Sequence, residues 1–228
     1  IYGRAFPHLF EEPIDIDLLI VEGTNFQFGL TPITGEHAIH IIEELLNTYS
    51  TNPFIVALDS MDMDTYLSLT RLFINYGKTI IVASKELLNT AEYGLNNELL
   101  DENMAKSIIA AEQDAVFSEI LNEISHKSED YVIFTEMNDV PNLLRKMRSI
   151  EHIKILLSME AESPNEGSFE GPLDEWLNMH NTITYRIRLS GHYYPYQLKM
   201  INQVIRPKKV LPIHTEEPQL LLKFFTTK

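Results

Sequence analysis

The sequence predicts an α/β protein with a mainly parallel sheet and flanking helices. Short apolar runs, rich in β-branched residues, recur along the chain, and most are apolar throughout rather than alternating. Such runs are typical of parallel strands covered on both faces. The segments between them repeat apolar residues at helical spacing, and alternation of strands with helices indicates βαβ units. The expected strands are residues 17–21, 54–58, 79–83, 131–135, 153–157, 184–189 and 210–213.

Helical periodicity and start signals mark the segments between the strands. Ser84 precedes one apolar helical run, and Asp59 and Ser60 precede another, so both places fit N-caps. Residues 160–173 are acidic, rich in Ser, Pro and Gly and without periodicity, so we expect a long loop there. The clearest expected helices are residues 36–49, 65–76, 103–124 and 140–147.

Composition narrows the class of protein. The chain has 228 residues, 44% of them hydrophobic, which is enough to form a sizeable core in one domain or two small ones. It contains no cysteine, which excludes disulfides and thiolate metal sites and favours the reducing cytoplasm. Any transition-metal site must therefore use His, Asp or Glu. No apolar run approaches the length of a membrane span, so we expect no membrane partner.

The charge is strongly acidic overall but unevenly distributed. The net charge is −15, which argues against nucleic-acid binding by the chain as a whole. Residues 180–228, however, carry eight basic residues against two acidic ones, a local balance of +6 that leaves −21 for residues 1–179. These basic residues either bind a partner or only solvate the last helix and strand ends.

Two histidines and a carboxylate follow expected strands. Ligands of open parallel sheets bind beyond the carboxyl ends of the strands. Glu22, His192 and His214 follow residues 17–21, 184–189 and 210–213, respectively. We expect a crossover helix at residues 196–205, ended by Pro207, so that the last two strands lie side by side with both histidines at one edge. Glu22 shares that edge if its strand is a neighbour, which the sequence leaves open.

Two imidazoles and a carboxylate at one edge are the ingredients of a metal site or of a general acid–base pair. Gly191, beside His192, favours a binding role because glycine lets the backbone approach a ligand closely. The alternative is that each histidine only forms hydrogen bonds within its own loop.

Three other groups of polar residues are weaker candidates. Asp59, Asp62 and Asp64 offer oxygen ligands for a hard cation, but their position favours capping of a helix start. His37 and His40 share one helix face, where we expect them to be solvated. Ser84-Lys85 resembles a phosphate cradle only loosely, because no glycine-rich loop accompanies it, and the N-cap interpretation is favoured.

The C-terminal stretch LSGHYYPYQLKMINQVIRPKKVLPIHTE (residues 189–216) resembles the signature of the β-CASP branch of the metallo-β-lactamase superfamily, the RNA-processing nucleases related to ribonuclease J. The shared pattern is a strand, Ser-Gly-His, a helix, Arg-Pro-Lys, a second strand and Pro-Ile-His. DLLIVEGTN (residues 17–25) is similar to an earlier motif of that family. The resemblance implies a Rossmann-like β-CASP domain at residues 31–182, and parts of a lactamase-like αββα domain at residues 1–30 and 183–228.

The resemblance also implies roles for individual residues. Glu22 would hold and polarise His192, which would protonate the leaving oxygen at the scissile phosphate. Ser190 and Gly191 would contact phosphate, and His214 would be a zinc ligand. Proteins of this family use two zinc ions to hydrolyse RNA phosphodiester bonds, so the expected partner is single-stranded RNA.

The family's main metal motif, His-x-His-x-Asp-His, is absent from this sequence. We interpret the chain as a C-terminal fragment and expect it to be inactive alone, because a catalytic zinc generally needs three protein ligands. Two alternatives remain: a catalytically silent family member that acts as a binding or scaffold subunit, and an unrelated α/β domain that binds a small anionic ligand. A homo-oligomer is also left open.

Overall fold

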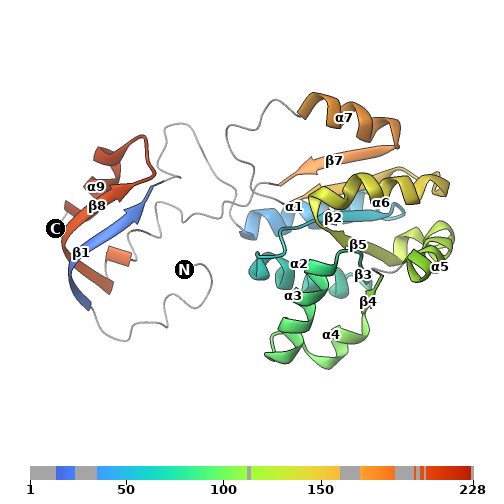
Figure 1. Cartoon of the computed structure of the whole chain (residues 1–228), viewed down its shortest axis with the longest axis horizontal. Coiled ribbons are helices and arrows are strands. Elements are labelled where there is room, and N and C mark those ends of the chain that lie inside the picture. Colours follow the sequence, from blue (N-terminus) through green and yellow to red (C-terminus); the bar gives the residue numbers. More distant parts are fainter. Residues whose placement is uncertain are drawn as a thin grey trace. The chain divides into compact units, whose positions relative to one another are not determined.

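Two parallel sheets organise the part of the chain that the structure describes (Figure 1). The computed structural model describes residues 14–23, 35–111, 114–159, 170–187, 198, 201–202 and 204–226. The chain divides into two compact units: a small unit from residues 1–34 and 190–228, and a large unit from residues 35–189. The predicted α/β class, with a mainly parallel sheet and flanking helices, is confirmed.

The sheet of the large unit has six strands in the order β4-β3-β5-β2-β6-β7, and every pairing is parallel. All residues of β2 and of β6 are buried, as expected for central strands that helices cover on both faces. The strands are β2 (Phe54–Ala57), β3 (Thr79–Val82), β4 (Ile108–Ala110), β5 (Tyr131–Thr135), β6 (Lys154–Ser158) and β7 (Thr182–Arg186).

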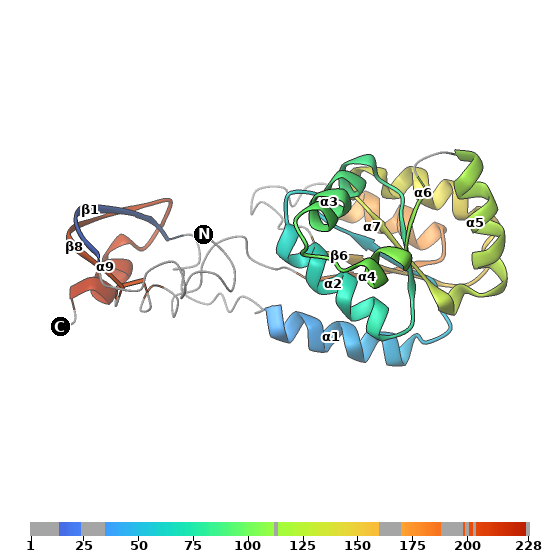
Figure 2. The same cartoon turned by 90° about the horizontal axis from the view of Figure 1, so that it is seen from below.

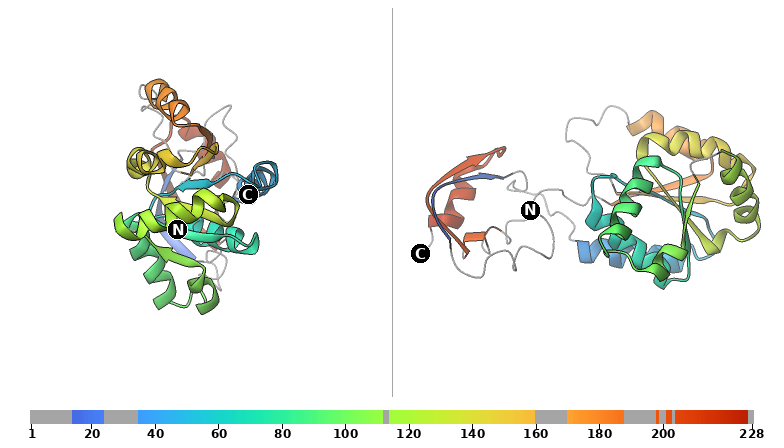
Figure 3. Two further views of the ribbon diagram at one scale, coloured as in Figure 1. Left: turned by 90° about the vertical axis from the view of Figure 1, so that its right-hand side faces the viewer. Right: turned by 60° about the horizontal axis from the view of Figure 1, so that its bottom comes forward.

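Helices surround this sheet (Figures 2 and 3). Crossovers between parallel strands are right-handed. Helices in connections that run toward the β4 edge of the sheet therefore lie on one face, and helices in connections that run toward the β7 edge lie on the other face. The α-helices are α1 (Gly35–Thr48), α2 (Met63–Asn75), α3 (Lys85–Asn96), α4 (Glu102–Lys106), α5 (Asp114–His126), α6 (Val140–Lys146) and α7 (Glu170–Met179). Short 3-10 turns lie at η2 (Ser128–Asp130), η3 (Met137–Asp139) and η4 (Met147–Ser149).

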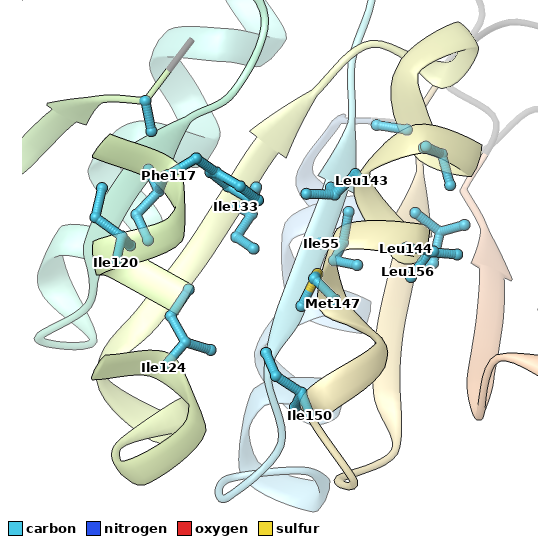
Figure 4. Packing of buried hydrophobic residues seen from close by; sticks show 14 of the residues in the cluster. Ile55, Phe117, Ile120, Ile124, Ile133, Leu143, Leu144, Met147, Ile150 and Leu156 are labelled. Carbon is cyan, nitrogen blue, oxygen red and sulfur yellow. The ribbon is translucent and has the colours of Figure 1, made fainter. Parts of the chain in front are cut away.

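One face of the sheet packs against α5, α6 and α7 (Figure 4). The strands contribute Ile133, Ile55 and Leu156, and the helices contribute residues such as Phe117 and Leu143. Each fully buried side chain of this size contributes about 1.5–3 kcal/mol relative to exposure. This cluster is therefore a main source of stability for the large unit.

The opposite face packs against α2. The ring of Phe134 in β5 meets Tyr66 edge-on at 5.7 Å between centroids and Phe73 at 5.8 Å. Phe73 also lies 6.3 Å from Phe54 of β2. These four aromatic residues are fully buried, and their tilted and edge-on arrangements are those that aromatic quadrupoles favour.

The start of α2 lies slightly later than predicted. Asp62, rather than Asp59 or Ser60, is the N-cap: its carboxylate accepts hydrogen bonds from the Thr65 N–H at 3.1 Å and the Thr65 hydroxyl at 2.6 Å. Asp59 instead accepts from the N–H of Met61 at 2.8 Å. Asp62 therefore caps the helix, as interpreted from the sequence, but the helix begins later than predicted.

The predicted helix over residues 103–124 is wrong in its middle. Strand β4 interrupts it, and its two isoleucines pair with β3 in the register Ile80↔Ile108 and Ile81↔Ile109. β-branched residues lose side-chain freedom in a helix and fit a pleated sheet. The strand has only three residues, and the sequence on both sides of it has helical periodicity. The strand was therefore not recognised in the sequence.

The small unit contains a two-stranded parallel ladder, β1 (Ile14–Glu22) with β8 (Ile205–Ile213), followed by α9 (Pro218–Thr226). The described residues between 198 and 204 are helical, but Ile205 and Pro207, expected to end that helix, already belong to β8. Proline can lie in a strand at the edge of a sheet, where its missing N–H costs nothing.

One face of the ladder forms a small core, in which Val21, Leu198 and Leu221 are buried. The other face carries four large apolar residues that are about half exposed within this chain. They are Leu18 (49%), Ile20 (56%), Leu211 (48%) and Ile213 (47%). We refer to these four residues as the apolar face.

Strands β7 and β8 belong to different sheets, contrary to expectation. β7 pairs with β6 in the large unit, and β8 pairs with β1 in the small unit. The units change at 34/35 and 189/190, so residues 183–187, expected in the C-terminal segment, belong to the large unit. The local rule that consecutive parallel strands are neighbours fails because the chain leaves one sheet for another between them.

None of the described helices has the length and apolar character needed to cross a bilayer.

Candidate functional site

The end of the β1–β8 ladder brings together two of the predicted site residues. Glu22 is the last residue of β1 and pairs with Ile213, the last residue of β8. The N–H of Gly23 donates to the Ile213 carbonyl at 3.1 Å, so the pairing continues one step past the strand. His214 follows immediately. Since paired strands lie about 4.8 Å apart, Glu22 and His214 leave the same edge as neighbours. The sequence left open whether the strand of Glu22 neighbours the strand of His214, and the pairing of β1 with β8 shows that it does.

His214 has an unusual backbone conformation. Its φ is 50°, in the left-handed region, and its side chain is exposed. Positive φ is uncommon for residues with a side chain, and such residues cluster where function requires a particular direction of the chain. The conformation turns the chain sharply at the end of β8. It therefore helps to set where the imidazole lies relative to Glu22.

Gly23 is required beside Glu22 by close packing. A Cβ at this position would lie 2.5 Å from Leu221 Cδ1 and 2.8 Å from Thr215 Cβ. Leu221 is fully buried, so its side chain has little room to move away. Thr215 is also held, because its hydroxyl accepts the N–H of Glu217 at 3.1 Å just before α9. The glycine therefore lets α9 and the segment after His214 approach the end of β1.

Gly23 and Thr215 were not among the residues predicted to contribute to this arrangement. The sequence contained one local signal for Gly23, namely its position between an acidic residue at the end of a strand and a polar residue. The contact with Leu221 joins segments about two hundred residues apart in sequence, and no local pattern indicates it.

The positive charge on β8 lies away from this edge and is partly balanced. Arg206, Lys208 and Lys209 are exposed in the first half of β8. From Lys209 to the end of β8 the strand extends roughly 13 Å. Asp15 pairs with Arg206 across the ladder, and the ammonium of Lys208 lies 2.6 Å from the Asp17 carboxylate. The local excess of basic residues in the sequence is therefore reduced in the fold.

Three predicted site residues, Ser190, Gly191 and His192, lie outside the described residues. For metal binding, no cluster of three or more His, Asp or Glu within the described ranges could hold an ion. Of the predicted zinc site, the structure describes His214, with Glu22 beside it. A catalytic zinc generally needs three protein ligands. Residues other than these would have to complete such a site, and zinc binding stays a prediction.

Two of the weaker candidate groups lie on α1 and at the start of α3. His37 and His40 are exposed on α1, and the His40 ring lies 3.9 Å from Glu43 and 3.5 Å from Glu44. Ser84 occupies the N-cap position of α3 as predicted, but its side chain does not cap the helix. Its hydroxyl lies within hydrogen-bonding distance of two carboxylates instead.

Comparison with known proteins shows a likeness in fold but none in sequence family. No protein-family model matches the chain, and a search of curated proteins finds no significant match. Among solved structures, the chain is similar to a crystal structure of a protein of unknown function from Enterococcus faecalis V583, with a TM-score of 0.61 and 15% sequence identity. The match covers 90% of this chain and 47% of the other, so the chain spans about half the length of that protein. At this identity the likeness shows the fold alone.

Proposed function

We propose that this chain is part of a cytoplasmic, zinc-dependent ribonuclease of the β-CASP type that hydrolyses phosphodiester bonds of single-stranded RNA. The single observation that carries the proposal is the adjacency of Glu22 and His214 at the ends of paired parallel strands. The two residues come from motifs far apart in the chain, and they are separated by 192 positions in the sequence. The left-handed backbone of His214 and the close packing of Gly23 support it, because both hold that edge in one conformation.

In this proposal each residue has a separate role. Glu22 accepts the N–H of the His192 imidazole, which fixes its tautomer and leaves the other ring nitrogen to donate a proton to the leaving oxygen. Ser190 and Gly191 hold the phosphate. His214 is a zinc ligand, and zinc would supply an activated water when bound. The remaining ligands come from residues other than those described, and the chain alone is inactive.

The apolar face of the small unit supports the view that this unit belongs to a larger domain. Parallel strands are normally covered on both faces, and here the second face remains half exposed. A two-stranded sheet is also too small to be stable without further strands or helices. A further layer of the same protein, over Leu18, Ile20, Leu211 and Ile213, would provide that cover.

A nuclease assay on the longest natural polypeptide that contains this chain tests the proposal. The wild type, with zinc or manganese, is compared with Glu22→Gln, His192→Ala and His214→Ala on single-stranded RNAs with a 5′-monophosphate and with internal sites only. We expect each substitution to lower the rate by at least about a hundredfold, the lower end of the range for general acid–base groups.

His40→Ala is the matched control, because His40 is an exposed histidine on α1 in the large unit. It should retain full activity. RNA binding without cleavage by the wild type would favour the scaffold alternative. Cleavage that survives all three site substitutions would refute the assignment of these residues.

A further inference from the structure

A second candidate site lies in the large unit, where the connections of two neighbouring strands diverge. β3 and β5 are paired, but β3 leads through α3 to the edge strand β4, whereas β5 leads through α6 in the opposite direction to β6. Right-handed crossovers place α3 and α6 on opposite faces. The carboxyl ends of two such strands leave a crevice between them, which is where open α/β sheets bind ligands.

A cavity of about 440 Å³ occupies this crevice. Its volume falls within the usual range for small-molecule sites, roughly 300–1,000 Å³. Its apolar wall comes from Ala83, Ala111, Phe117 and Leu143, at the ends of β3 and β4 and on α5 and α6. Figure 4 shows Phe117 and Leu143 within the buried cluster that continues below this wall. The cavity is thus built on the rigid core of the unit.

The first turn of α3 has no side-chain cap and carries charges of both signs. Ser84 is only 2% exposed and stands at the N-cap, yet its hydroxyl lies 3.2 Å from Glu86 and 3.3 Å from Glu136 instead of accepting from a helix N–H. The first turn then contains the cation of Lys85, which the helix dipole disfavours there, and the carboxylate of Glu86. Both Ser84 and Lys85 line the cavity. A bound anion would accept from the N–H groups of this turn and offset the lysine.

A second cation is held at the wall of the cavity by an aromatic ring. The ammonium of Lys146, at the end of α6, lies 5.5 Å from the centroid of the Phe117 ring. Phe117 is 2% exposed, so the ring is fixed and orients the ammonium. Asp139 and Asn142, from the start of α6, complete the polar part of the lining.

We propose that this cavity binds a nucleoside 5′-monophosphate. Lys85 and Lys146 pair with the phosphate, the wall of Phe117 and Leu143 contacts the base, and Asp139 and Asn142 bind hydroxyl groups of the ribose. Glu86 and Asp139 balance the charge of the two lysines within the lining. A monophosphate therefore fits better than a triphosphate, whose additional negative charge would meet these carboxylates. The site lies wholly in the large unit and is independent of the Glu22–His214 edge.

Calorimetric titration of the full 228-residue chain tests the proposal. The probes are AMP, GMP, CMP and UMP, the corresponding nucleosides, inorganic phosphate, and ATP. We expect at least one monophosphate to bind with a dissociation constant of about 0.1–1 mM, a modest affinity for an open cavity. Its nucleoside, inorganic phosphate and ATP should each bind at least about tenfold more weakly. The nucleoside lacks the phosphate, inorganic phosphate lacks the base and ribose, and the additional phosphates of ATP are repelled by the carboxylates.

Variants locate the site. Lys85→Gln combined with Lys146→Gln should weaken monophosphate binding by at least about tenfold, as expected for the loss of charge-assisted hydrogen bonds. Lys127→Gln is the matched control, since Lys127 is exposed and does not line the cavity, and it should leave binding unchanged. Circular dichroism checks that every variant is folded.

Three results would overturn the proposal. The first is no saturable binding of any monophosphate at concentrations tenfold above the expected range. The second is equal binding of inorganic phosphate, which would make the site a simple anion site. The third is weakening by His214→Ala but not by the lysine pair, which would place the nucleotide at the other edge. None of these results bears on RNA cleavage, so this proposal and the proposed nuclease can fail separately.

Discussion

The two units bury strands of similar sequence to different extents. The strand run FIVAL in the large unit is fully buried on both faces. In the run DLLIV of the small unit, Val21 is buried, whereas Leu18 and Ile20 are about half exposed. Both runs predict a strand covered on both sides, and among the described residues this prediction holds for the large unit. The small unit therefore carries an apolar face that its described residues leave about half exposed. Substitutions matched between the two units test this view.

The largest expected difference concerns core leucines. Leu156 in β6 is fully buried, and Leu156→Ala should lower the free energy of unfolding by about 2–5 kcal/mol, through lost burial and the cavity left behind. Leu211 in β8 is 48% exposed, and Leu211→Ala should cost less than about 1 kcal/mol in this chain. Urea denaturation of both variants measures the contrast. Equal costs would show that the apolar face is covered in solution, for example by a second copy of the chain.

Two glycines give the next contrast. Gly23→Ala in the small unit should cost about 1–3 kcal/mol, because a Cβ there would overlap Leu221 and Thr215. Gly35→Ala at the start of α1 is the control, because a Cβ there meets nothing within 4 Å. Hydrogen exchange, read separately for β1, α9 and the large unit, localises the effect. Faster exchange in β1 and α9 of Gly23→Ala, with the large unit unchanged, is the expected result. A neutral Gly23→Ala would contradict the tight packing.

Buried and exposed lysines differ in the same way. Lys154 is 3% exposed, and its ammonium donates to the carbonyls of Ile150 at 2.7 Å, His152 at 3.3 Å and His180 at 3.4 Å. Lys154→Met leaves these acceptors with fewer donors and should cost about 1–3 kcal/mol. Lys208 forms an exposed ion pair with Asp17, and Lys208→Met should cost about 0–1 kcal/mol.

The cost of Lys154→Met should also depend on pH. Burial lowers the pKa of Lys154 below its usual 10.5, so the unfolded chain holds this proton to higher pH than the folded protein does. Stability contributed by the wild-type lysine therefore rises as pH approaches 10.5 from the lowered pKa. The gap between wild type and Lys154→Met should widen over that range, measured by urea denaturation from pH 7 upward. A gap that narrows would mean that the charged form is the one the fold favours.

The sequence predicted most of the large unit because its strands and helices are encoded locally. The exception, β4, has only three residues, and helical periodicity on both sides masked it. The partners of β7 and β8 could not be predicted locally, because each pairs with a strand other than its neighbour in sequence. The candidate site follows the same division. Glu22 and His214 were found as strand ends, but their adjacency, the contact of Gly23 with Leu221 and the left-handed turn at His214 depend on pairing across the chain.

The smallest expected effect tests how strictly the large unit satisfies its buried polar groups. Tyr66 and Thr70 lie one turn apart on α2, and neither hydroxyl has a partner of good hydrogen-bond geometry among the described residues. Tyr66→Phe removes a buried hydroxyl while it keeps the ring against Phe134, so stability at neutral pH should be unchanged or rise by up to about 1 kcal/mol.

Alkaline pH provides a second test of the same residue. Burial raises the pKa of Tyr66 to about 12, so the unfolded chain ionises this group near pH 10 before the folded protein does. The wild type should therefore lose stability from pH 10 to 12, and Tyr66→Phe should lose less, as measured by thermal unfolding across that range. Parallel losses in the two proteins, together with a clear destabilisation at neutral pH, would mean that a bound water satisfies the hydroxyl. The buried hydroxyl under α2 would then depend on solvent, rather than on a protein group, for its hydrogen bond.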